Sequence, residues 1–289
     1  MILKEDSSEQ KLRGAYYTPL KLAKKMVDFF KDDLSIKSIL EPSCGDGVFV
    51  DALLESQFLS QHKRVTAIEI EKKEAEKLSE KLKDNSNIDV VNGDFFEFYH
   101  KHKDMDTYDL ILGNPPYIRY QYLEEKQRSE MAEILTSHGM KANKLINTWV
   151  GFMVACVHML SDNGKIAFVI PAEILQVAYA EDLRLFLSNK LSKITLLTFE
   201  ELVFPGIEQE VVVFIGEKGD SEKGIKIVEL NNLEDLENLN IYAIPFAFPM
   251  IKNLILFLVI ITICVVSTLL ILRKTKNESI IELLRQDEM

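Results

Sequence analysis

Residues 114–117, Asn-Pro-Pro-Tyr, constrain the fold of this chain more than any other short segment. They directly follow residues 108–113, an apolar run with the length and aliphatic content of a buried parallel strand. The two prolines fix φ and hold the backbone carbonyls of the turn in place. Open α/β sheets bind ligands at the carboxyl ends of such strands. The segment therefore predicts an α/β protein with a ligand-binding turn here.

The side chains of this turn suit a flat base that carries an amino group. Asn114 offers an amide oxygen, and Tyr117 offers an aromatic face. An exocyclic amino group needs acceptors and a base needs a stacking partner, so the turn indicates a pocket for a flipped-out adenine. The alternative is a proline-rich turn without chemistry, because short motifs also occur by chance.

A second turn lies in residues 38–49, which read as a short strand, a glycine-bearing turn and the start of a helix. A doubly wound fold binds its cofactor at such a turn. Gly45 and Gly47 lack a Cβ, so a ligand can approach the backbone closely. The spacing matches neither a dinucleotide-binding motif nor a phosphate loop, which argues against nicotinamide and nucleoside triphosphates. Cys44 is interpreted as a small packing residue.

Two further predicted strands lead into carboxylates. The strand 65–69 ends in Glu69, about twenty residues beyond the glycine turn, the separation at which an acidic residue meets ribose hydroxyls. Glu71 is interpreted as a solvated charge at a helix start. After the strand 88–91, Asp94 could accept from an adenine amino group, or it could cap a turn while Phe95 and Phe96 are core.

A helix is predicted to begin near Thr18. Apolar residues follow at helical spacing, Thr18 would be a good N-cap and Pro19 a good first helical residue. That interpretation accounts for the Thr-Pro pair without any function. A ligand contact by the Thr18 hydroxyl is the functional alternative.

In their order, five motifs resemble the gamma class of N6-adenine DNA methyltransferases. They are Tyr-Tyr-Thr-Pro at 16–19, Glu-Pro-Ser-Cys-Gly-Asp-Gly at 41–47, Glu69, Gly-Asp-Phe at 93–95 and Asn-Pro-Pro-Tyr at 114–117. The resemblance covers about residues 12–216. It implies a Rossmann-like, S-adenosylmethionine-dependent sheet, DNA as the substrate and a restriction-modification system.

The resemblance also implies roles for the cofactor-side residues. The methionine end of S-adenosyl-L-methionine would lie against Thr18, Glu41, Ser43, Gly45 and Gly47. Glu69 would bind the ribose hydroxyls, and Asp94 with Phe95 would bind the cofactor's adenine.

On the target side, the resemblance assigns the acceptors for the amino group to Asn114 and the Pro115 carbonyl. Tyr117 would stack on the flipped base and Phe204 would pack against its other face. The same pocket would suit an RNA adenine or a protein glutamine. A third hypothesis is a non-catalytic, membrane-attached remnant.

We expect seven strands, the last one antiparallel as the resemblance implies. Their predicted ranges are 38–41, 64–70, 88–91, 108–112, 164–170, 193–199 and 211–215. A helix is expected over 145–160. The insertion 118–143 either clamps DNA or forms a solvated amphipathic helix.

Charge and cysteine content limit the kinds of partner and cellular location that fit this chain. A net charge of -11 opposes binding to a polyanion unless basic residues gather on one face. The three scattered cysteines indicate neither a disulfide framework nor a metal cluster, so no metal is expected and a reducing, cytoplasmic location fits.

The carboxyl-terminal part departs from the family pattern. The uncharged segment 254–272, with basic residues on both sides, is long enough to be a membrane-spanning helix, so attachment to a membrane is an expected partner interaction. We expect a truncated methyltransferase without a target-recognition domain, which would bind DNA weakly unless a separate specificity subunit supplies base readout. The expected parts are a disordered tail (1–12), the catalytic domain (13–230), a linker or remnant (231–250), the apolar helix (251–273) and an amphipathic tail (274–289).

Overall fold

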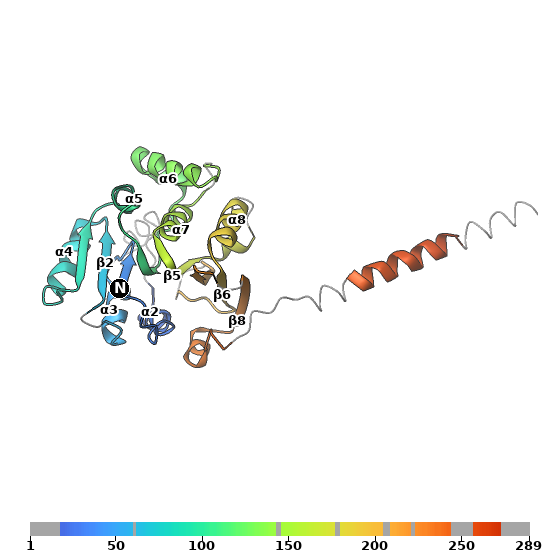
Figure 1. The fold of residues 1–289 in the computed structure, drawn as a ribbon, viewed down its shortest axis with the longest axis horizontal. Helices are drawn as coiled ribbons and strands as arrows, with labels where there is room; N and C mark the ends of the chain where they lie inside the picture. The colour runs from blue at the N-terminus through green and yellow to red at the C-terminus, as the bar shows by residue number, and fades with distance from the viewer. Residues whose placement is uncertain are drawn as a thin grey trace, which may run out of the picture. The chain divides into compact units, whose positions relative to one another are not determined.

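In a computed structural model, the chain forms an eight-stranded mixed sheet with helices packed against it (Figure 1). The structure describes residues 18–59, 62–142, 146–176, 180–204, 209–220, 223–243 and 257–272. The chain divides into two compact units, Met1–Phe246 and Ala247–Met289, and the sheet lies in the first.

The strands follow the order β3-β2-β1-β4-β5-β7-β6-β8. They are β1 (Ser38–Glu41), β2 (Arg64–Glu69), β3 (Ile88–Asn92), β4 (Tyr108–Gly113), β5 (Leu160–Pro171), β6 (Lys193–Phe199), β7 (Val211–Glu217) and β8 (Gly224–Leu230). The pairs among β1 to β5 are parallel, whereas β7 runs antiparallel to both β5 and β6. The predicted Rossmann-like α/β sheet and its antiparallel strand are confirmed.

The helices of the first unit connect these strands. They are α2 (Leu20–Asp28), α3 (Val48–Glu55), α4 (Lys72–Lys81), α5 (Phe95–His102), α6 (Glu125–Ser137), α7 (Thr148–His158) and α8 (Glu181–Lys190), with 3-10 turns η1 (Tyr120–Tyr122), η2 (Ala172–Leu175) and η4 (Leu233–Asn238). Helix α4 is amphipathic and buries only Ala75 and Leu78. Helix α7 is apolar on all sides, so it is covered on all sides, by α5, α6, α8 and β5. Figure 1 shows α6 beside α7.

Strand β8 was not predicted, because its pattern of burial inverts the usual one. Ile225 and Ile227 are more than half exposed, at 56% and 55%, whereas Lys226 between them is 8% exposed. The Lys226 ammonium group donates to the carbonyl of Ile241. The apolar–polar–apolar order of residues 225–227 would therefore place the wrong face of the strand against the core.

Residues 231–243, the described part of the predicted linker or remnant 231–250, pack within the first unit. Leu236 and Ile241 are each 2% exposed. Glu237 lies 2.9 Å from the Lys21 ammonium group on α2. Burial of the two apolar side chains fixes the segment more than this exposed ion pair, because exposed pairs contribute little.

The prediction that segment 254–272 spans a membrane is corrected by the structure. The described part of this segment is a helix over 257–272. Within the described residues, no helix is both long enough and apolar enough to cross a membrane. The predicted tails 1–12 and 274–289 lie outside the described residues.

Gly47 provides a test of the turn before α3. Its φ is +86°, and a Cβ would lie 2.5 Å from Leu78 Cδ1 on α4. We expect Gly47→Ala to lower the free energy of unfolding by about 1–3 kcal/mol, from the left-handed backbone and the displaced Leu78. Urea unfolding measures this. Gly93→Ala is the matched control, because its Cβ would meet no described atom within 4 Å. An equal loss in both variants would contradict the prediction.

Candidate active site

The carboxyl ends of neighbouring parallel strands bring the predicted motifs together. Glu41 ends β1, Glu69 ends β2 and Gly113 ends β4, directly before the tetrapeptide. Gly113 has a φ of +156°, and a Cβ there would lie 3.6 Å from Pro42 Cδ and 3.8 Å from Glu41 Cγ. The tetrapeptide therefore begins against the turn that follows β1.

Asn114 joins three of the predicted motifs. Its side-chain Nδ2 donates to the Thr18 hydroxyl at 3.1 Å, and its backbone carbonyl accepts from the Ser43 hydroxyl at 3.3 Å. Thr18 is 5% exposed and does not cap a helix, because α2 begins at Leu20 after Pro19 without a side-chain cap. The prediction of Thr18 as an N-cap is wrong. Its hydroxyl instead accepts a hydrogen bond from the Asn114 side chain.

The glycine turn is bonded to the end of β2. The backbone N–H of Gly45 donates to Glu69 Oε2 at 2.7 Å, and that of Glu71 donates to Oε1 at 2.7 Å. Each carboxylate oxygen keeps a second lone pair for a ligand. Gly45 has a φ of +55°, and a Cβ there would meet no described atom within 4 Å. Among the described residues, open space therefore borders the turn.

Glu41 is a buried acid without a described partner. It is 0% exposed, and neither carboxyl oxygen has a hydrogen bond among the described residues. Burial, and then the negative charges of Asp46 and Glu69, raise the pKa of Glu41 well above its usual value. Buried polar groups are normally hydrogen-bonded, so Glu41 is an exception among the described residues.

Asp94 is the N-cap of α5. Its Oδ1 accepts from the backbone N–H groups of Phe96 at 2.7 Å and Glu97 at 3.2 Å. Its Oδ2 accepts from Gln127 Nε2 at 2.7 Å. Phe95 is 3% exposed and stacks on Phe152, with the ring centroids 4.6 Å apart. The alternative in which Asp94 is a cap and Phe95 belongs to the core is therefore confirmed. A contact of Asp94 and Phe95 with adenine stays a prediction.

The remaining base-side residues are also held firmly. Pro115 is buried, and Tyr117 is 9% exposed with its hydroxyl donating to the carbonyl of Val169 at 3.1 Å. That bond orients the tyrosine ring. Phe204 is buried, in the segment that follows β6. Strand β6 runs parallel to β5, because β7 is antiparallel to both, so β6 ends at the same edge of the sheet as β5. Its packing against a base stays a prediction.

Comparison with known proteins identifies the family. Residues 18–204 match the family described as Eco57I restriction-modification methylase. The chain belongs to this family. It is 31% identical over 247 residues to the type II methyltransferase M.HincII of Haemophilus influenzae, covering 83% of the chain and 45% of that protein. It is 28% identical over 228 residues to M.AccI of Acinetobacter calcoaceticus, covering 78% of the chain and 40% of that protein. The chain thus spans less than half the length of these relatives.

Solved structures show the same fold. A DrdV–DNA complex has a TM-score of 0.65 at 15% identity, covering 84% of this chain and 31% of that one. A putative class I S-adenosylmethionine-dependent methyltransferase from Listeria monocytogenes has a TM-score of 0.59 at 13% identity, covering 76% of this chain and 71% of that one. The sheet of this Eco57I-family chain therefore has the class I methyltransferase-like fold.

Three residues that hold the site were missed in the sequence. Asn92 donates from Nδ2 to the backbone carbonyl of Glu69 at 2.9 Å, and Gln127 and Val169 bind Asp94 and Tyr117 as described above. Glu124 and Gln127 form a capping box at the start of α6, and their spacing was the available signal. It was weak, because glutamate is not a preferred N-cap residue.

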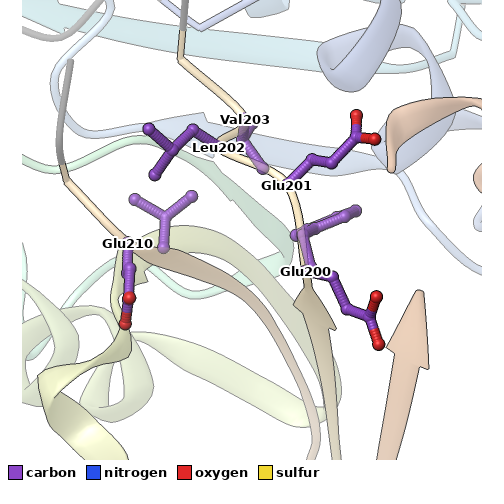
Figure 2. A pocket seen from close by; sticks show the side chains of 7 residues that line it. Glu200, Glu201, Leu202, Val203 and Glu210 are labelled. Atoms are coloured by element: carbon purple, nitrogen blue, oxygen red, sulfur yellow. The ribbon is translucent and has the colours of Figure 1, made fainter. Parts of the chain in front are cut away.

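A small hollow lies near Phe204 in this methylase fold, between the end of β6 and the start of β7. Its volume is about 50 Å³, and it is lined by Phe199, Glu200, Glu201, Leu202, Val203, Glu210 and Val211. Figure 2 shows the three glutamate side chains pointing in different directions instead of converging. Among the described residues, no cluster of acidic, histidine or cysteine side chains could hold a metal ion. A hollow of this size suits one or two waters, not a base.

Proposed function

We propose that this chain is the catalytic part of a methyltransferase that transfers a methyl group from S-adenosyl-L-methionine to the N6 amino group of adenine in DNA. The observation that carries the proposal is the pair of bonds at Asn114. They join the Thr18 motif, the glycine turn and the base tetrapeptide at one sheet edge. Membership of the Eco57I family and the gamma-class order of the motifs support the same activity.

The residues present fit the proposed cofactor. S-adenosylmethionine carries an ammonium group, ribose hydroxyls and an adenine amino group, which are all hydrogen-bond donors. The site offers a carboxylate after each of three neighbouring strands, on Glu41, Glu69 and Asp94. Glu41 suits the ammonium group, because a positive charge would pair its buried carboxyl. The open space at Gly45 allows close approach to the turn. When bound, the cofactor supplies an activated methyl group.

The chain's own residues would bind and activate the target base. The Asn114 amide oxygen and the Pro115 carbonyl accept from the adenine amino group, whose lone pair is otherwise delocalised into the ring. Hydrogen bonds to its protons favour electron density on nitrogen during attack. The Tyr117 ring, oriented through Val169, stacks on the base, and Phe204 packs on its other side. No covalent bond between enzyme and base is required.

A parallel transfer assay tests the proposal. The full chain is incubated with tritiated S-adenosylmethionine and unmethylated DNA, RNA or protein. We expect label in DNA, and N6-methyladenine after its digestion. The DNA should be tested at high concentration and low salt, because a net charge of -11 weakens binding to a polyanion. Label in RNA or protein but not in DNA would overturn the proposal.

A further inference from the structure

Gln127, in the first turn of α6, links this helix to Asp94. Its Nε2 donates to Asp94 Oδ2 at 2.7 Å, while its Oε1 accepts from the backbone N–H of Glu124 at 3.4 Å. Both ends of the amide are therefore used, and the group is held in one orientation. The other oxygen of the Asp94 carboxylate, Oδ1, accepts from two backbone N–H groups.

The Gln127 bond is not needed to dock α6, because the apolar face of the helix does that. Met131, Ile134 and Leu135 are each at most 1% exposed. The packing is tight, since a Cβ on Gly151 of α7 would lie 2.8 Å from Met131 Cγ and 3.1 Å from Phe96 Cζ. The hydrogen bond from Gln127 therefore acts mainly on the position of the Asp94 carboxylate.

Glu130, one turn further along α6, places a second carboxyl group near Asp94. Its Oε2 is buried and has no hydrogen-bond partner among the described residues. Burial, and then the negative charge of Asp94, raise the pKa of Glu130 above its usual value. Gln127 thus provides a neutral donor where another carboxylate lies nearby. Without that donor, Asp94 Oδ2 would lose this hydrogen bond, and the carboxylate would be held through Oδ1 alone.

We infer that Gln127 is a positioning residue for the adenine end of the cofactor. It orients Asp94 Oδ2, whose second lone pair accepts from the adenine amino group. The inference rests on the proposed function, since it assigns a partner to one residue of the proposed cofactor site. It also gives the insertion 118–143 a role in cofactor selection.

Calorimetric titration of the full chain tests this with two probes. S-adenosylhomocysteine carries the 6-amino group, and S-inosylhomocysteine carries a carbonyl there. We expect the wild type to prefer the first. Gln127→Glu keeps the shape and the bond from Glu124 but presents a carboxylate to Asp94, and Gln127→Met removes the polar group. In both, affinity for S-adenosylhomocysteine should fall about ten-fold, as for a lost hydrogen bond to a charged group, and the preference should shrink.

Lys126→Met is the matched control, because Lys126 joins the same two helices through an exposed ion pair with Glu97. We expect its affinities to stay within about two-fold of the wild type, since exposed pairs contribute little. Thermal unfolding of each variant checks that it folds. If both Gln127 variants weaken the two probes equally or keep the full preference, the inference is wrong. A wild type that binds neither probe would instead refute the proposed function.

Discussion

Asn114→Ala is expected to lower methyl transfer by at least about a hundred-fold while cofactor affinity stays within a few-fold of the wild type. The substitution removes the proposed acceptor for the reacting amino group, an interaction that we expect to matter most in the transition state. The backbone carbonyl that accepts from Ser43 remains. Among the described contacts, the substitution removes the bond from Asn114 Nδ2 to the Thr18 hydroxyl.

Glu69→Ala is the contrasting variant. It removes the carboxylate that binds the backbone N–H groups of Gly45 and Glu71, and with it the proposed ribose acceptor. Its cofactor affinity should therefore fall strongly. Titration with S-adenosylhomocysteine and transfer of tritiated methyl groups to DNA measure the two effects separately. An Asn114→Ala protein that lost cofactor binding as badly as Glu69→Ala would refute this division of roles.

The sheet could be predicted because its strands carry strong local signals. Strand β4 is an apolar run stopped by two prolines, and β1 is stopped by Pro42 and the glycine turn. Strand β6 was predicted with its observed bounds, Lys193–Phe199. Parallel pairing then places the ends of β1, β2 and β4 at one edge, which is why residues distant in the sequence were expected to share a site.

Contacts that depend on tertiary docking could not be predicted. The Thr-Pro pair satisfied the local rule for a helix start, yet the Thr18 hydroxyl binds a side chain 96 residues away. The Gln127 amide likewise reaches Asp94 only because α6 docks on α5 through its apolar side. Strand β8 had the opposite difficulty, since its lysine is buried by a contact with the chain after it. In each case the deciding partner lies outside the local pattern.

Glu41→Gln is expected to make the folded protein more stable at neutral and alkaline pH. Burial raises the pKa of Glu41 well above its usual value, so the folded state favours the protonated acid. Such a group contributes its full stability below its unfolded-state pKa of about 4.3 and loses it as the pH rises toward the folded-state pKa. Glutamine cannot ionise, so the variant does not have this loss. We therefore expect a higher free energy of unfolding for the variant than for the wild type at pH 8.

Urea unfolding between pH 4 and pH 8 measures this, with Glu229→Gln on the exposed face of β8 as the control that makes the same glutamate-to-glutamine change. The gain should grow with pH for Glu41→Gln and stay near zero for the control. The same variant should bind S-adenosylhomocysteine more weakly, because a neutral amide cannot pair with an ammonium group. Higher stability with lower affinity would mean that Glu41 is kept for binding at a cost to the fold. If Glu41→Gln instead destabilised the protein at pH 8, the carboxylate would be needed by the fold itself, and its assignment to the cofactor would lose its physical basis.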